Sequence, residues 1–132
     1  MNSGYSGTPL GKKLGVKDGQ VSWRLAMPDS VAAEIEATPR LLDAPAPGLE
    51  MAHVFTTRRA ELEAVLRRLR TLIDPAGMVW VSWPKKASKV DTDISEDVIR
   101  TVALPMGFVD VKVCAVDAVW SGLKLVIRKE LR

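Results

Sequence analysis

The hydrophobic residues of the chain recur with two periods, the two-residue spacing typical of strands and the three-to-four-residue spacing typical of helices. The clearest helix is predicted over Thr57–Ile73. Its apolar positions form one stripe, which consists of Leu62, Val65, Leu66, Leu69, Leu72 and Ile73. Burying one such leucine stabilises a fold by roughly 1.5 to 3 kcal/mol, so we expect the stripe to hold this helix on a sheet.

Further segments have the composition of strands, and they are Gln20–Met27, Arg40–Asp43, Met51–Thr56, Met78–Trp83, Phe108–Asp117 and Leu123–Lys129. In the first of them every second residue from Val21 to Met27 is apolar, which predicts one buried face. Met78–Trp83 is apolar on both faces, as is typical of an interior strand covered by helices on each side. The last two flank Trp120–Ser121–Gly122 and predict an antiparallel hairpin.

Three shorter helices are predicted from their end signals. The first lies within Thr8–Gly15, with Thr8 as its cap and Gly15 as its terminator. The second covers Val31–Ala37, and either Asp29 or Ser30 is its N-cap.

The third of these helices follows the acidic segment Asp91–Asp97, and Pro105 and Gly107 close it. We expect its apolar residues Ile94, Val98 and Val102 to face one way. Between the long helix and the strand Met78–Trp83, Asp74–Gly77 is predicted to be a turn.

The alternation of strands and helices predicts an α/β fold of the Rossmann-like kind, with a mainly parallel sheet and a C-terminal antiparallel hairpin. The chain has 132 residues, of which 47% are hydrophobic and 27% charged, which suits one folded domain over residues 1–132. We expect residues 1–7 to be a flexible start.

Charge and cysteine content narrow the function classes only a little. Nineteen Lys and Arg against sixteen Asp and Glu leave a net charge of +3, a weak signal for nucleic acid. One cysteine, no apolar leader and no uncharged apolar stretch near the roughly 20 residues of a bilayer span predict a cytoplasmic protein without a membrane segment.

The single cysteine and the single histidine both fall in strand-like runs. We expect Cys114 to be a small hydrophobic residue of a sheet, and His53 to lie in an apolar strand. Neither a metal site nor a catalytic pair is predicted from one residue of each type.

The segment Leu69–Val81, with the helix before it and the terminal hairpin after it, resembles the second half of class I S-adenosylmethionine methyltransferases. The resemblance implies a truncated form of that fold. Three further pieces resemble a small bacterial family known as a domain of unknown function: Gly4–Leu10 with Lys13–Gly15, Trp80–Lys86, and Val109–Asp117 with Trp120–Lys124. That second resemblance implies no activity.

The turn after the first strand departs from the methyltransferase pattern. The family resembles dinucleotide-binding proteins in placing glycines there, so that bare main chain can approach the cofactor. In this chain Ala26–Ser30 contains no glycine, and Pro28 lacks an N–H. Asp43 is either the acidic residue that holds a ribose in this family or a carboxylate of a simple turn. We therefore expect no bound S-adenosylmethionine and no other cofactor.

Ligands of open α/β sheets bind beyond the carboxyl ends of the strands. At this edge we single out seven candidate ligand-binding residues: Pro28, Asp29, Trp83, Lys85, Lys86, Ser88 and Lys89. The lysines and the serine suit a phosphate or carboxylate, and Trp83 offers a stacking face. The alternative is a solvated loop whose lysines pair with the acidic residues of Asp91–Asp97.

Three other surfaces each allow a functional and a purely structural interpretation. The long helix carries Arg58, Arg59, Arg67, Arg68 and Arg70, which form either a solvated face or a weak nucleic-acid surface. Trp120 either contacts a partner or folds back onto the core. An exposed edge strand at Leu123–Lys129 would allow a homodimer, although its basic residues discourage pairing.

The function that these observations favour is a binding module for a small anionic ligand or a protein partner. One alternative is a minimal transferase that holds an anionic substrate with Lys85, Lys86 and Lys89, although the sequence offers no evident general base for it. The other alternative is weak nucleic-acid binding, which the small net charge disfavours.

Overall fold

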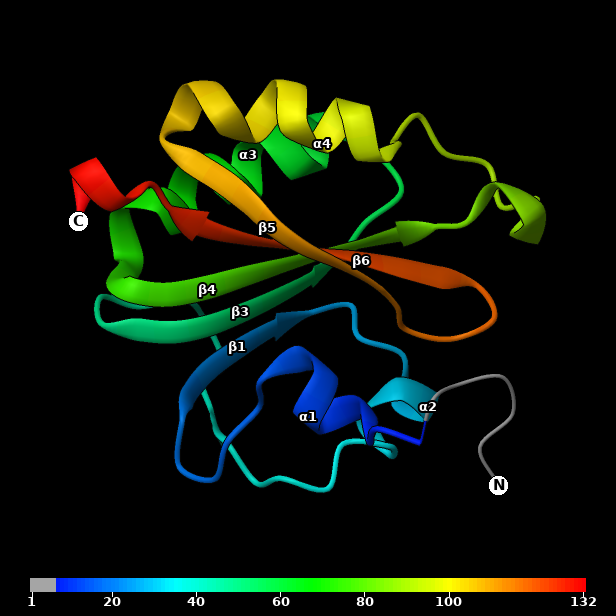
Figure 1. Cartoon of the computed structure of the whole chain (residues 1–132), viewed down its shortest axis with the longest axis horizontal. Helices are drawn as coiled ribbons and strands as arrows, with labels where there is room; N and C mark the ends of the chain where they lie inside the picture. Colours follow the sequence, from blue (N-terminus) through cyan, green and yellow to red (C-terminus); the bar gives the residue numbers. More distant parts are fainter. Residues whose placement is uncertain (1–6) are drawn as a thin grey trace.

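A computed structural model of the chain describes residues 7–132, so residues 1–6 of the predicted flexible start, with part of the Gly4–Leu10 segment, lie outside the described residues. The described part forms a sheet with the strand order β2-β1-β3-β4-β6-β5. The strands are β1 (Val21–Leu25), β2 (Arg40–Leu41), β3 (Leu49–Phe55), β4 (Ile73–Pro84), β5 (Phe108–Ala115) and β6 (Trp120–Ile127). Strands β1 to β4 are mutually parallel, and β6 pairs antiparallel with β4 and β5 (Figure 1). The predicted α/β class and C-terminal hairpin are confirmed.

Helices cover both faces of this sheet. Helices α3 (Arg59–Leu72) and α4 (Glu96–Ala103) lie on one face, and the short helices α1 (Leu10–Leu14) and α2 (Asp29–Ala32) lie on the other (Figure 1). Three single 3₁₀ turns complete the chain: η1 (Lys86–Ser88), η2 (Leu104–Met106) and η3 (Lys129–Leu131). No helix in the described part is long and apolar enough to cross a membrane.

The predicted stripe of the long helix packs as expected. Leu62, Leu66 and Leu69 are fully buried on the α3 and α4 side, where they join apolar residues of β3, β4 and β6. On the other face Trp80 of β4 is fully buried, and its Nε1 donates a hydrogen bond of 2.8 Å to the oxygen of Leu14. This bond fixes the end of α1 to the middle of the sheet.

The two N-terminal helices differ from their predictions at their starts. Pro9 and Pro28 occupy the N-cap positions of α1 and α2, and neither helix has a side-chain cap. The predicted caps Thr8, Asp29 and Ser30 are therefore wrong. Proline suits such positions because its fixed φ lets the chain enter the helix without a free N–H. Gly15 ends α1 with φ of 78°, as predicted.

Helix α2 is also shorter than the predicted Val31–Ala37. Beyond Ala32 the main-chain bonds become three-residue turns, with Glu34 N donating to Val31 O and Ile35 N to Ala32 O. Val31 and Ile35 are nevertheless buried in the α1 and α2 side of the core.

The buried face of α4 differs from the predicted one by one residue, because Ile99 takes the place of Val98. Ser95 caps the helix by accepting a hydrogen bond from Val98 N at 3.2 Å. Ile99 is fully buried together with Val102, whereas Val98 is only half-buried. Gly107 then adopts φ of 100° and ends the turn that follows α4, as predicted.

The predicted turn Asp74–Gly77 is instead an irregular bulge inside β4. The register with β3 passes from Leu49 opposite Ile73 to Met51 opposite Met78, so β4 holds extra residues at this point. Asp74 Oδ1 accepts the N–H of Ala76 at 2.9 Å, which gives the bulge the local bond of a turn.

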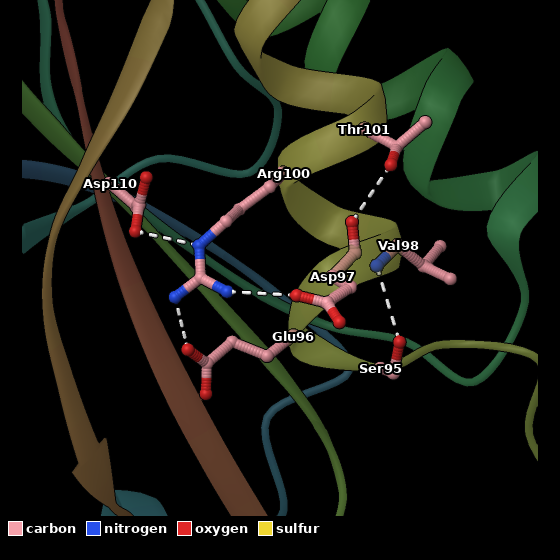
Figure 2. A network of polar contacts seen from close by, with 7 residues as sticks. All are labelled: Ser95, Glu96, Asp97, Val98, Arg100, Thr101 and Asp110. Carbon is pink, nitrogen blue, oxygen red and sulfur yellow. Dashed lines mark hydrogen bonds and ion pairs between the residues drawn. The ribbon is translucent and has the colours of Figure 1, made fainter.

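The edge of the sheet beside the hairpin is β5, and β6 lies between β4 and β5. The prediction that Leu123–Lys129 is an exposed edge is therefore wrong. Arg100 of α4 holds β5 in place by bonding Asp110 at 3.0 Å, and it also contacts Glu96 and Asp97 (Figure 2). These carboxylates raise the pKa of the Arg100 guanidinium. With its donors occupied in this way, Arg100 acts as a clamp between α4 and the sheet.

Candidate functional site at the carboxyl edge of the sheet

The parallel strands β1, β2, β3 and β4 end at one edge of the sheet, which brings their following loops together. The strand order reverses between β2-β1 and β3-β4, which is the arrangement at which α/β folds bind ligands. Pro28 and Asp29 follow β1, and the loop with Lys85–Lys89 follows β4. The two groups of predicted residues thus lie at the same edge, with β3 between their strands.

Lys85 and Ser88 are occupied by bonds within the protein. Lys85 Nζ donates to Asp117 O at 2.6 Å, and Ser88 Oγ donates to Lys85 O at 2.6 Å. Lys85 N also donates to Val119 O at 2.7 Å. These contacts attach the turn of the β5–β6 hairpin to the end of β4.

Lys86 and Lys89 remain exposed at the same loop. Neither forms a hydrogen bond or an ion pair through its side chain with any residue of 7–132. Lys89 has φ of 61°, and its main-chain N–H bonds Lys86 O. These two ammonium groups are the charges of the loop that a ligand can meet.

Trp83 does not offer the stacking face that was expected. Its side chain is 8% exposed and packs in the α3 and α4 side of the core. The alternation of β4 turns Trp83 inward, because Trp80 and Ser82 occupy the opposite face.

The acidic segment Asp91–Asp97 does not pair with the lysines. Asp91 forms an ion pair with Arg58 at 2.7 Å, and Asp93 Oδ1 accepts the N–H of Arg59 at 2.7 Å. The loop before α4 is therefore fastened to the first turn of α3, where carboxylates meet the positive end of a helix. The alternative hypothesis is therefore wrong about the pairing of the lysines with Asp91–Asp97, although Lys86 and Lys89 are exposed to solvent as it expected.

The turn after β1 carries side chains at the position where dinucleotide-binding folds place glycine. Ala26 adopts φ of 55°, a conformation that favours glycine. Met27 then turns to the α1 and α2 side instead of continuing the face of Val21 and Leu25, which corrects the predicted alternation. Pro28 is half-buried and Asp29 is exposed at the start of α2.

Several arginines of α3 are used internally. Arg59 pairs with Glu63 at 3.4 Å, and Arg70 Nε donates to Met106 O at 3.0 Å. Arg67 and Arg68 are exposed. The five arginines proposed as a basic surface thus do not act as one group of free charges.

Trp120 and Cys114 both lie against the core. This agrees with the hypothesis that Trp120 folds back onto the core and with the prediction that Cys114 is a small hydrophobic residue of the sheet. Trp120 packs edge-on against Phe55 with ring centroids 5.2 Å apart, and both residues are half-buried or buried on the α1 and α2 side. Burial raises the pKa of the Cys114 thiol, which opposes thiolate formation.

His53 is buried and neutral. Its side chain is 1% exposed, and its Nε2 lies 2.7 Å from Ser82 Oγ. Burial, with a smaller contribution from the charge of Arg24, lowers its pKa to about 3. No group of three or more His, Cys, Asp or Glu side chains in residues 7–132 is arranged to hold a metal ion.

Arg24 was not singled out by the sequence. Its side chain is half-buried, and burial lowers the pKa of its guanidinium. The available signal was its place in β1, because alternation puts Arg24 with buried Ser22 on the face opposite Val21 and Leu25.

Comparisons with known proteins agree with this architecture. No family model matches the chain, and no curated protein sequence matches it. Among solved structures, a methyltransferase from Aquifex aeolicus that depends on S-adenosylmethionine aligns with a TM-score of 0.61 and 12% identity, over 88% of this chain and 86% of that chain. A methyltransferase from Pyrococcus furiosus aligns with a TM-score of 0.57 and 10% identity, over 88% and 79%.

Fibrillarin from Aeropyrum pernix, solved with natively bound S-adenosylmethionine, aligns with a TM-score of 0.54 and 14% identity, over 90% of this chain and 69% of that chain. The chain has a class I methyltransferase-like fold. It resembles a truncated form of that fold, since it spans only part of the fibrillarin chain. Identities this low show the fold alone. No family model supports the likeness to a domain of unknown function.

Proposed function

We propose that this methyltransferase-like domain does not use S-adenosylmethionine and acts as a binding module for an anionic ligand. The observation that carries the proposal is the turn after β1. Ala26 presents a Cβ at φ of 55°, and Met27 and Pro28 add half-buried side chains beside it. A fold that brings main chain close to a cofactor uses glycine at such a turn because any side chain keeps the cofactor away.

The ionisable groups near this edge also favour binding over catalysis. A general base must accept a proton near neutral pH. His53 has a pKa of about 3 and is 1% exposed, so it remains unprotonated and out of contact with solvent. Asp91 and Asp93 are engaged by the first turn of α3.

The exposed positive charges at this edge favour an anionic ligand. Lys86 and Lys89 are exposed, and neither has a side-chain partner in the described residues. Each exposed ammonium contributes about 1 kcal/mol toward an anion in water. Two such charges alone give affinity weaker than millimolar, so a ligand must also use main-chain and side-chain contacts at the edge.

A titration with inorganic pyrophosphate, followed by amide NMR shifts of the full chain, tests the proposal. We expect saturable shifts in Lys85–Val90, and we expect Lys86→Ala with Lys89→Ala to weaken binding by about tenfold or more. Lys17→Ala is the matched control, because Lys17 is exposed at the amino edge and should leave the affinity unchanged. No saturable shift, or equal affinity in the double variant, would contradict the assignment of this loop.

A further inference from the structure

A groove lies on the α3 and α4 side of the sheet, between helix α3 and strand β1. Its volume is about 190 Å³. Trp23 of β1 and Pro45 line one side of it, and residues from the second half of α3 line the other. These α3 residues are Ala64, Val65, Arg68 and Leu69. Of the lining residues, all within the described part of the chain, only Arg68 is charged.

The groove is open because the crossover from β2 to β3 contains no helix. The strand order β2-β1-β3 makes this connection pass β1, and it consists of residues 42–48. A crossover between parallel strands usually needs a dozen or more residues, most often including a helix that covers the sheet. Here a short loop makes the crossover (Figure 1), and Val21, Trp23 and Leu25 on this face of β1 are half-buried. The face of β1 beside α3 is therefore partly accessible to a ligand.

Arg68 brings an unpaired positive charge to the rim of the groove. Its side chain is exposed and forms no hydrogen bond or ion pair with any residue of 7–132. Residues three and four positions away on a helix are the usual partners of such a side chain. For Arg68 these positions are all uncharged, and they hold Ala64, Val65, Thr71 and Leu72. The helix thus presents a free guanidinium beside apolar side chains.

We propose that the groove binds a small aromatic carboxylate, which consists of one planar ring with a single carboxylate group. The ring lies against Trp23, Pro45 and Val65, and the carboxylate pairs with the Arg68 guanidinium. An arginine fork matches the two oxygens of a carboxylate. Aromatic and aliphatic side chains remove the ring from water. The groove shares no residue with the lysine loop, so this proposal and the proposed function can fail independently.

The size of the groove agrees with one ring and not with a larger partner. A cavity of about 150 Å³ lined by apolar side chains holds a benzene molecule. The groove is larger, at about 190 Å³, and the carboxylate of benzoate meets Arg68 at its open rim. A helix of a partner protein instead needs a long groove that takes apolar side chains from successive turns.

The charge of the groove favours an anionic ring over a neutral ring or a simple anion. A neutral ring gains the apolar contacts but leaves the Arg68 guanidinium unpaired. An anion without a ring meets one exposed arginine, and a single exposed charge attracts it only weakly in water. Because the two contributions come from different parts of the ligand, a molecule that carries both a ring and a carboxylate binds best.

The experiment titrates the full chain, labelled with ¹⁵N, with sodium benzoate and follows the amide and indole signals by NMR. We expect saturable shifts of the Trp23 indole and of the Val65 and Leu69 amides, with a dissociation constant on the order of millimolar. Benzyl alcohol is a neutral ring of similar size, and sodium acetate is an anion without a ring. Each should bind at least about fivefold more weakly than benzoate.

Two variants separate the charged part of the site from the apolar part. Arg68→Gln should raise the benzoate dissociation constant about fivefold or more. Arg67→Gln is its matched control, because Arg67 is an exposed arginine of the same helix that does not line the groove. Ala64→Phe fills the groove and should remove the saturable shifts. Ala60→Phe, at an exposed alanine of α3 outside the groove, should leave the affinity unchanged.

All four substitutions are at exposed helix positions, so the variants should fold, and their amide spectra verify this. No saturable response to benzoate, an equal affinity for benzyl alcohol, or unchanged affinity in Arg68→Gln would each overturn the proposal. Shifts confined to Lys85–Val90 would assign benzoate to the lysine loop and overturn it as well. A failed pyrophosphate titration with an intact benzoate response contradicts the proposed function alone.

Discussion

Lys85 Nζ lies 2.6 Å from the main-chain oxygen of Asp117, so the lysine at the end of β4 holds the turn of the β5–β6 hairpin. The Asp117 carboxylate shapes the same turn, since its Oδ1 accepts the N–H groups of Val119 and Trp120, both at 2.8 Å. A residue predicted to bind a ligand therefore stabilises the fold at the edge of the candidate site.

Lys85→Met should lower the free energy of unfolding by about 1 kcal/mol, because it removes one charge-assisted bond to a partly solvated carbonyl. Lys86→Met, at an exposed lysine of the same loop, should change it by less than about 0.5 kcal/mol. Urea denaturation of both variants makes the comparison. Equal effects of the two substitutions would show that the bond to Asp117 does not contribute.

Ala26→Gly should stabilise the protein by about 0.5 kcal/mol. The left-handed conformation costs an alanine roughly 1 to 2 kcal/mol, and glycine loses somewhat less than that through the greater freedom of its unfolded chain. Ala33→Gly is the control, because Ala33 has φ of −64° and glycine there should destabilise by about 0.5 to 1 kcal/mol. Thermal unfolding of the pair should give shifts of opposite sign, and shifts of the same sign would argue against strain at Ala26.

The buried His53 should make the protein less stable in mild acid. Its pKa is about 3 in the folded state against 6.5 in the unfolded chain, so only the unfolded chain takes up a proton between these values. Stability from this group is complete above pH 6.5 and falls as the pH decreases toward 3, with a loss of about 2 kcal/mol at pH 5.

Urea denaturation at pH 7 and pH 5 measures this loss. His53→Gln keeps a polar side chain near Ser82 but does not titrate, so most of the difference between the two pH values should disappear. A difference of the same size in the variant would assign the acid sensitivity to other groups.

The elements with strong periodicity were predicted well from the sequence. The long helix, the apolar strand at Met78–Trp83 and the terminal hairpin all appear, because their burial follows directly from residue spacing. Boundaries that depend on main-chain geometry were missed. Ala26 breaks the face of β1, and the bulge at Asp74–Gly77 continues a strand through a turn-like sequence. Neither feature changes the spacing of hydrophobic residues along the chain, so periodicity could not predict it.

The candidate site was predicted less well, because contacts between distant segments decide which charges are free. The sequence places the lysines next to Asp91–Asp97, yet Asp91 pairs with Arg58 from another element. Trp83 was expected to be a stacking surface, and strand alternation buries it. Arg24 is the reverse case: strand alternation places it on the face opposite Val21 and Leu25, but only the pairing of β1 with β3 places it beside His53.

Calorimetric titration of the full chain with S-adenosylmethionine tests the central claim most directly. The side chains of Ala26, Met27 and Pro28 at the turn after β1 predict no saturable heat at millimolar cofactor. Binding of one molecule per chain with a micromolar dissociation constant, together with NMR shifts at those three residues, would contradict the claim.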